Sequence, residues 1–172
     1  MTTRTDRTDS PEERERADLA ATLHRHRGFL RQTVRGLDDA AARSTPTASS
    51  LSLASLLKHV ADTEEMWIGF CRTGSMPGSD GWTGEDTRFV LGPEHTLEAL
   101  LARYDEVAAA TDAFLDGADL GVAHPLPAAP WFEPGASWTV RRVLWHVLAE
   151  TAQHAGHADI IRETLDGART MG

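Results

Sequence analysis

The spacing of apolar residues along the chain predicts four long helices, and the clearest of them runs from Ser137 to Gly167. Apolar residues recur there at helical intervals and form one continuous stripe. The stripe consists of Val140, Val143, Leu144, Val147, Leu148 and Ile161. Ser137 or Thr139 can cap the start of this helix, and Asp166-Gly167 suits its end. We therefore expect a long helix with one face in the core.

Three earlier segments have the same periodicity, whereas strand signals are nearly absent. These predicted helices run from about Ser10 to Leu37, from Ser52 to Arg72 and from Thr96 to Asp116. They are joined by a polar connector over 38–50 and by loops rich in glycine or proline over 73–94 and 117–136. The pattern predicts an all-α fold, a four-helix bundle with long connecting loops.

The 172 residues fit a single domain with a sizeable core, which we place at residues 11–172 after a polar, disordered tail at 1–10. No apolar run is long enough for a membrane span, and the N-terminus has no apolar signal core. The net charge of −9, without a basic stripe, argues against nucleic-acid binding. The single cysteine, Cys71, excludes an internal disulfide and fits a cytoplasmic location. It ends an apolar helix, so we expect a small core residue.

Four ionisable residues lie on one edge of the last predicted helix: His146, Glu150, His154 and His157. At about 100° per residue they fall within an arc of roughly 80°. Burying them without partners would be costly, and a divalent metal ion is the simplest partner. Glu150 and His154 are four residues apart, so they stand on the same face and can share one ion.

A third metal ligand must come from another helix, and His59 is the best-placed candidate because it borders the core beside Leu56 and Val60. Three protein ligands would leave a position open for water or substrate, as in catalytic zinc sites. Two imidazoles and a carboxylate suit Zn²⁺, Fe²⁺ or Ni²⁺. The alternative is that these histidines lie at the surface or at the core edge without a metal.

Other residues near these helices have two interpretations each. Glu64 could orient a metal ligand, or it could belong to a solvated helix face. Trp82 and Phe89 could tether the 73–94 loop or line a pocket. The 117–136 loop leads directly into the histidine helix, so we expect it near one end of any site there.

Two segments carry a resemblance to a known family. They are LLKHVADTEEMW around His59 and WTVRRVLWHVLAETAQHAGHADIIRETLDG at the end of the chain. With them the chain resembles the DinB/YfiT-like metalloenzyme superfamily, and within it an actinobacterial branch, over about Leu19 to Gly167. The resemblance implies an antiparallel four-helix bundle whose metal ligands would be His59, Glu150 and His154. The glutamate at 150 is similar to the mycothiol-dependent maleylpyruvate isomerase type, whereas many relatives have histidine there.

The resemblance also bears on the residues around the ligands. His157 stands where many relatives carry glutamine, so it is expected to line the site or to act as an alternative ligand. His146 lies one turn before Glu150 and could support it. Arg141 and Arg142 could meet an anionic thiol cofactor, although Arg142 could equally be an exposed helix residue.

Several members of the superfamily are thiol S-transferases or thiol-dependent isomerases. We therefore expect a metal-dependent, low-molecular-weight thiol S-transferase that detoxifies electrophilic small molecules, with zinc favoured over nickel or iron. The chain is rich in arginine and alanine and has one lysine, Lys58, which fits a GC-rich actinobacterial source and hence mycothiol as the thiol. Isomerase activity is not expected, because the isomerase type has a second domain. A homodimer is expected by resemblance.

Two other functions are compatible with the same sequence. One is a non-catalytic metal- or ligand-binding bundle that acts in a stress response. The other is a structural bundle without a metal.

Overall fold

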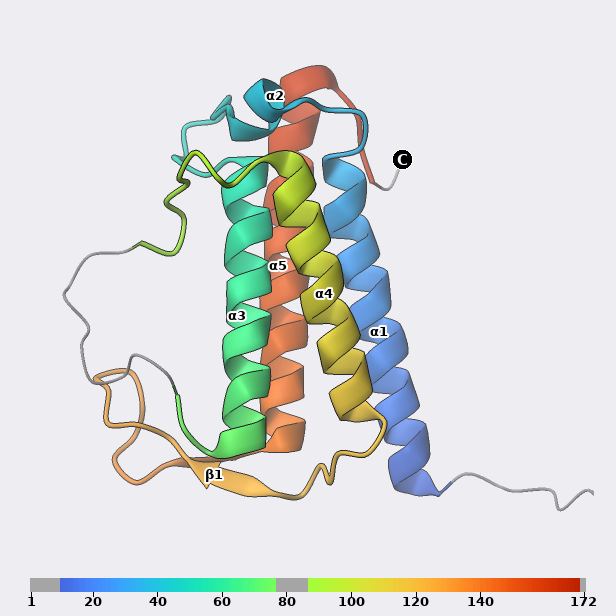
Figure 1. Cartoon of the computed structure of the whole chain (residues 1–172), viewed down its shortest axis with the longest axis vertical. Helices are drawn as coiled ribbons and strands as arrows, with labels where there is room; N and C mark the ends of the chain where they lie inside the picture. Colours follow the sequence, from blue (N-terminus) through green and yellow to red (C-terminus); the bar gives the residue numbers. More distant parts are fainter. Residues whose placement is uncertain (1–9, 77–86, 171–172) are drawn as a thin grey trace, which may run out of the picture.

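The computed structural model describes residues 10–76 and 87–170 and consists of a four-helix bundle with small additions at its two ends (Figure 1). The helices are α1 (Pro11–Thr33), α2 (Asp39–Arg43), α3 (Leu53–Thr73), α4 (Leu97–Leu115) and α5 (Val140–Asp166). The strands are β1 (Ala123–Pro125) and β2 (Ser137–Thr139). The predicted all-α bundle is confirmed. Trp82 and most of the predicted tail lie outside the described residues.

The long helices form two pairs that run in opposite directions: α1 and α5 point one way, α3 and α4 the other (Figure 1). α1 packs on α5 and α4, and α3 packs on α4 and α5. Because α3 and α4 run in parallel, the chain must return along the whole bundle before α4 can begin. This requirement accounts for the long connection between them, and the α3–α5 contact brings the two histidine-bearing helices together.

The helix ends follow the local sequence. The hydroxyl of Thr139 accepts a hydrogen bond from the backbone N–H of Arg142, at 3.1 Å, and so caps α5. Gly167 ends α5 in the left-handed conformation, at φ 80°, which glycine adopts without steric cost. Of the two caps predicted for this helix, Thr139 is therefore confirmed and Ser137 is wrong, because Ser137 lies in β2.

Three short elements, two strands and one helix, are not predicted by the sequence. The strands β1 and β2 pair in antiparallel register, with His124 opposite Trp138. α2 lies in the polar connector predicted over 38–50, and the carboxylate of Asp38 caps it. Since β2 runs directly into α5, the small sheet fixes the start of α5 and holds Trp138 beside it.

The core consists of two apolar clusters, one toward each end of the bundle. Along every long helix, the residues of one cluster are separated from those of the other by at least one buried polar residue. These residues are Arg27 in α1, Glu64 in α3, Thr111 in α4, and Thr151 with His154 in α5. A polar layer therefore crosses the middle of the bundle.

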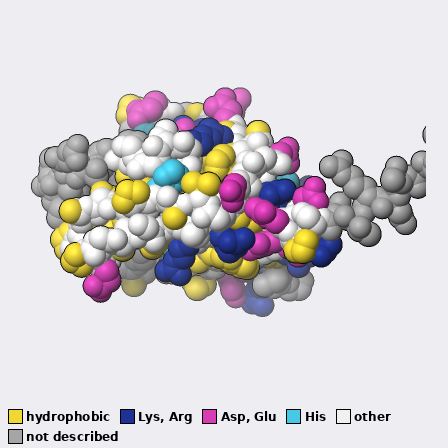
Figure 2. Space-filling view, turned by 90° about the horizontal axis from the view of Figure 1, so that it is seen from below, with side chains coloured by type: hydrophobic (Ala, Val, Ile, Leu, Met, Phe, Trp, Pro, Cys, Tyr) yellow, Lys and Arg dark blue, Asp and Glu magenta, His cyan; other side chains and the backbone are white. Residues whose placement is uncertain are grey.

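The surface has no single character at the end that carries β1. Acidic and basic side chains are interspersed over part of that end, and hydrophobic side chains are scattered among uncharged ones elsewhere on it (Figure 2). Within the described residues, no helix has both the length and the apolar character that crossing a bilayer would require.

Candidate metal centre

The structure brings His59, Glu150 and His154 to one point between α3 and α5. Each side chain offers one ligand atom, and these atoms all lie within 4.8 Å of one another. Nε2 of His59 is 3.8 Å from Oε2 of Glu150, and Nε2 of His154 is 3.5 Å from the same oxygen. Within residues 10–76 and 87–170, this is the one group of three His, Cys, Asp or Glu side chains close enough to share an ion. The ligands predicted from the sequence are thus neighbours in space.

The three side chains differ in exposure. The imidazoles of His59 and His154 are 7% and 11% exposed, whereas the carboxylate of Glu150 is 29% exposed. The centre is therefore enclosed on the imidazole side and reachable from solvent on the carboxylate side. An open side is what a catalytic metal site needs, because substrate must reach the ion.

The electrostatics of Glu150 suit a ligand. The nearby imidazoles of His154 and then His59 hold the pKa of its carboxyl far below the usual range, with the charges of His146 and His154 adding to them, although burial acts in the opposite direction. Glu150 is therefore a carboxylate at neutral pH. Two imidazoles and an ionised carboxylate form a donor set that fits a divalent transition metal.

Phe89 covers one side of the centre. Its ring centroid lies 4.4 Å from that of His59 and 6.0 Å from that of His154. Phe89 thus lines the candidate site, one of the two interpretations that its position in the sequence allowed.

His146 flanks the carboxylate of Glu150 together with two tryptophans. Its ring packs edge-on against Trp67 and Trp138, at centroid distances of 4.9 Å and 5.3 Å, and its Nε2 is 3.8 Å from Oε1 of Glu150. Burial lowers the pKa of His146, and the charge of Arg142 lowers it further, although the charge of Glu150 opposes them. The ring of Phe132 contacts Trp138 in turn, so the 117–136 loop does lie near one end of the centre.

The sequence pattern did not identify Trp138 as a residue that borders the candidate centre. The available signal was its place directly before the Thr139 cap, which holds the side chain next to the first turns of α5. Helical periodicity could not reveal this contact, because Trp138 lies in β2 and its position depends on the pairing of β2 with β1.

His157 contacts the candidate ligand His154 at the ring nitrogen that does not face Glu150. Its Nδ1 lies 3.3 Å from Nδ1 of His154, the nitrogen opposite the one near Glu150. His157 is not part of the three-residue group that could share an ion. It therefore packs against a candidate ligand, and its role in the site stays a prediction.

The two arginines proposed for cofactor binding lie differently. Arg141 donates to both carboxylate oxygens of Glu15 in α1, at 2.6 Å and 3.0 Å. Its guanidinium is thus already paired with a carboxylate. Arg142 is exposed, and its guanidinium lies 4.9 Å from the ring centroid of Trp138. Only Arg142 is held by a residue that borders the candidate centre.

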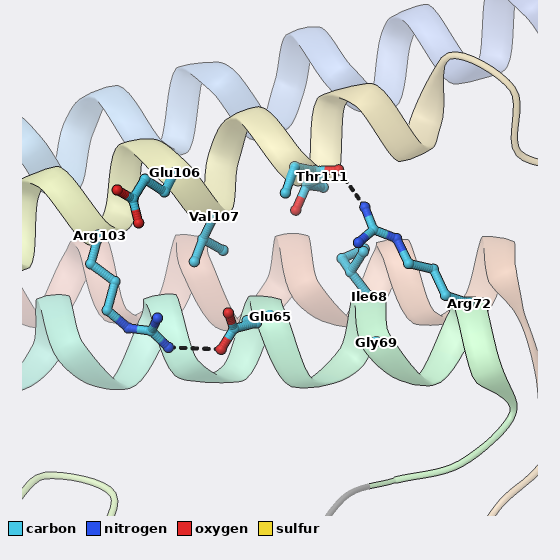
Figure 3. Close-up of a pocket in the computed structure, with 9 residues that line it drawn as sticks. Glu65, Ile68, Gly69, Arg72, Arg103, Glu106, Val107 and Thr111 are labelled. Carbon is cyan, nitrogen blue, oxygen red and sulfur yellow. Dashed lines mark hydrogen bonds and ion pairs between the residues drawn. The ribbon is translucent and has the colours of Figure 1, made fainter.

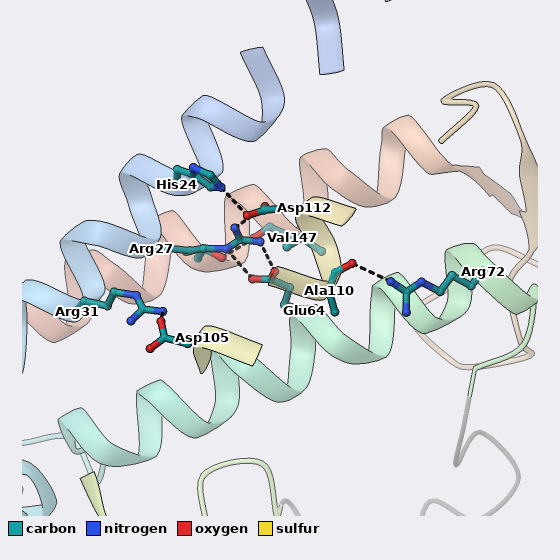
Figure 4. A network of polar contacts seen from close by, with 10 residues as sticks. His24, Arg27, Arg31, Glu64, Arg72, Asp105, Ala110, Asp112 and Val147 are labelled. Carbon is teal, nitrogen blue, oxygen red and sulfur yellow. Dashed lines mark hydrogen bonds and ion pairs between the residues drawn. The ribbon is translucent and has the colours of Figure 1, made fainter. Parts of the chain in front are cut away.

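Glu64 matches neither interpretation made from the sequence. It is almost completely buried, so it is not part of a solvated face, and its carboxylate pairs with the guanidinium of Arg27 rather than with a metal ligand (Figure 4). The physical reason is that Glu64 points into the polar layer between the two apolar clusters, where a charge needs a partner.

A groove of about 280 Å³ lies between α3 and α4, away from this centre (Figure 3). Inside it Arg103 donates to Glu65, at 2.7 Å, and Arg72 donates to the carbonyl of Ala110, also at 2.7 Å. None of His59, Glu150 and His154 lines the groove, so it offers no route to the candidate ion.

Comparison with solved structures supports the fold. A crystal structure of a conserved protein from Enterococcus faecalis aligns with a TM-score of 0.66 over 88% of this chain and 97% of that one. The sequences are 19% identical, so this likeness concerns the fold alone. No curated protein matches the chain.

Comparison with protein families gives a more specific result. The family model described as mycothiol S-transferase matches residues 18–167. The match includes both segments that carry the resemblance noted in the sequence, and with them His59, Glu150 and His154. Since it spans most of the chain, and the bundle agrees with it, the chain belongs to the DinB-like mycothiol S-transferase family.

Proposed function

We propose that this protein is a metal-dependent S-transferase that joins a low-molecular-weight thiol, mycothiol, to electrophilic small molecules and so detoxifies them. The observation that carries the proposal is the convergence of His59, Glu150 and His154 in a chain of the mycothiol S-transferase family. The convergence supplies a place for a metal ion, and the family supplies the type of reaction.

The three residues have complementary tasks in this proposal. His59 and His154 would hold the ion from the enclosed side, and Glu150 would add a negative charge from the side that solvent can reach. A bound divalent cation supplies a Lewis acid that lowers the pKa of a coordinated thiol, so that thiolate exists at neutral pH. Phe89 excludes water from one side of His59.

The transfer itself breaks the S–H bond of the thiol and forms an S–C bond to the electrophile. The proton of the thiol is released, and a leaving group, where the electrophile has one, departs with the electrons of its bond to carbon. The attacking sulfur is not the protein's own, because Cys71 is buried and its burial raises the pKa of the thiol to about 12. The sulfur must therefore come from the cosubstrate.

A thiol-consumption assay tests the activity. Protein purified without a histidine tag is stripped of metal, supplied with Zn²⁺, and given an alkyl halide with mycothiol, bacillithiol, glutathione or cysteine in turn. We expect zinc-dependent loss of thiol that is fastest with mycothiol. If zinc accelerates the consumption of none of these thiols, the proposal is wrong.

Metal analysis tests the centre separately. His59→Ala is expected to abolish retained metal, because it removes the only ligand contributed by α3 among the three described. His26→Ala is the matched control, since His26 lies on α1 beside Phe29 and outside the three-residue group. Equal metal content in the two variants would contradict the assignment.

The alternative is a metal- or ligand-binding bundle without turnover. Such a protein would close four side chains around its ion, with His157 as the fourth. The position of His157 behind His154 favours the catalytic proposal, because it leaves three ligands. Anomalous scattering from a zinc-soaked crystal would count the ligands directly. Homodimer formation stays a prediction, which sedimentation velocity would test.

A further inference from the structure

The two ring nitrogens of His154 have different neighbours. Nε2 lies 3.5 Å from Oε2 of Glu150, and Nδ1 lies 3.3 Å from Nδ1 of His157. A neutral imidazole carries its hydrogen on one nitrogen only. If Nε2 binds an ion, that nitrogen must be deprotonated, and the hydrogen of the neutral ring must be on Nδ1.

A hydrogen on Nδ1 of His154 needs an acceptor, because the residue is buried. The hydrogen bond that the structure gives to this nitrogen is with His157. Histidine ligands of metals generally donate their second N–H to a carboxylate, a carbonyl or water, which fixes the ring and its tautomer. Here the same place is taken by a second imidazole.

An imidazole at position 157 can form a hydrogen bond with either tautomer of His154. Without an ion, the carboxylate of Glu150 favours a hydrogen on Nε2 of His154, which leaves Nδ1 as an acceptor. With an ion, Nδ1 becomes the donor. The Nδ1 atom of His157 can meet both states, because imidazole has a tautomer that donates there and another that accepts.

We propose that His157 is a positioning residue that holds His154 in its Nδ1–H tautomer when an ion is bound, and that it thereby tightens metal binding. This inference rests on the metal centre of the proposed function. It assigns His157 no contact with the ion, since its Nδ1 faces the side of the His154 ring that is turned away from Glu150.

Zinc affinity, measured by competition with a chromogenic chelator, tests the inference. His157→Leu keeps the bulk but can neither donate nor accept, so we expect Kd to rise about 10- to 100-fold. His157→Gln keeps a donor and an acceptor on one flexible side chain, and should restore Kd to within a few-fold of the wild-type value. His26→Leu is the matched control and should leave Kd unchanged.

The results of the zinc titrations distinguish a failure of the His157 inference from a failure of the proposed function. If the wild-type protein binds no zinc, the proposed function fails, and this inference fails with it. If the wild type binds zinc and His157→Leu binds it equally well, only the role of His157 is wrong. Should His157→Leu not fold, the spectra described next decide the matter.

Imidazole ¹⁵N spectra supply a readout that a purely structural role would not change. In the zinc-loaded wild type, we expect the hydrogen of His154 on Nδ1 and the metal-induced shift on Nε2, with no metal-induced shift on either nitrogen of His157. A hydrogen on Nε2 of His154 in that state would overturn the inference. A metal-induced shift on His157 would overturn it too, because His157 would then be a ligand.

Discussion

At the scale of single residues, the buried ion pair between Arg27 and Glu64 links helices in the middle of the bundle. Their side chains are 3% and 0% exposed, and Arg27 also donates to Asp112, at 2.9 Å (Figure 4). Burial lowers the pKa of Arg27, but hydrogen bonds and charges from Glu64 and Asp112 outweigh this, so its pKa is raised. The pair therefore joins α1 to α3, and Asp112 extends it to α4.

We expect Glu64→Leu to lower the free energy of unfolding by about 3–5 kcal/mol, because it leaves the guanidinium of Arg27 buried with one carboxylate partner fewer. The double variant Arg27→Met with Glu64→Leu should recover most of that loss, since two apolar side chains of similar volume then meet. Urea unfolding of both variants measures the difference. A double variant no more stable than the single one would contradict this account.

Asp112 should make stability depend on pH. Burial alone would raise the pKa of its carboxyl, but hydrogen bonds from Arg27 and His24, with their charges, hold it below the ordinary value of 3.8. A pKa that is lower in the folded state adds stability above 3.8, and this stability is lost as pH falls through the folded pKa. Asp112→Asn should therefore differ most from the wild type in urea unfolding near neutral pH, and least in strong acid. A difference that stays constant with pH would rule out this linkage.

Glu64 is also an example of a residue whose interaction partner could not be predicted from the sequence. Periodicity placed His59, Glu150 and His154 on core-facing edges correctly, because each belongs to a strongly patterned helix. The partner of Glu64 is Arg27, which lies 37 residues earlier in the chain, on α1. Helical spacing within one segment carries no information about such a pair, so only the packed structure could identify it.

At the scale of elements, the start of α5 depends on Thr139. Its hydroxyl satisfies the N–H of Arg142, and an alanine there would leave this group without its cap. We expect Thr139→Ala to lower the free energy of unfolding by about 1 kcal/mol. Ser137→Ala is the matched control, because Ser137 is exposed and lies in β2, and it should change stability by less than about 0.5 kcal/mol. Equal losses in chemical denaturation would mean that both hydroxyls matter to the start of the helix.

The long helices could be predicted from the sequence and the small elements could not, for one physical reason. About twenty residues of apolar periodicity specify a helix face many times over. A strand of three residues, such as β1, gives at most one full alternation, and its Pro125 argues against a strand by propensity. The pairing of β1 with β2 is a tertiary contact, and it is what brings Trp138 to the edge of the candidate centre.

At the scale of the whole molecule, the candidate centre couples metal binding to folding. Its ligands come from α3 and α5, and His59 and His154 lie 95 residues apart in the chain. The three groups therefore meet only when the bundle is formed. An ion that binds the folded chain and not the unfolded one must stabilise it by mass action.

We expect free Zn²⁺ at about 100 times its Kd to raise the free energy of unfolding by about 2.7 kcal/mol. This should appear as a higher Tm in calorimetry that increases further with zinc concentration. The increase should fade in mild acid, because imidazole ligands must be unprotonated to bind. Protein carrying His59→Ala should remain folded, and its Tm should no longer respond to zinc, because the two remaining ligands, Glu150 and His154, both lie on α5. If the Tm of this variant still rises with zinc, the ion binds elsewhere. The α3–α5 contact would then not form the metal centre of the proposed function.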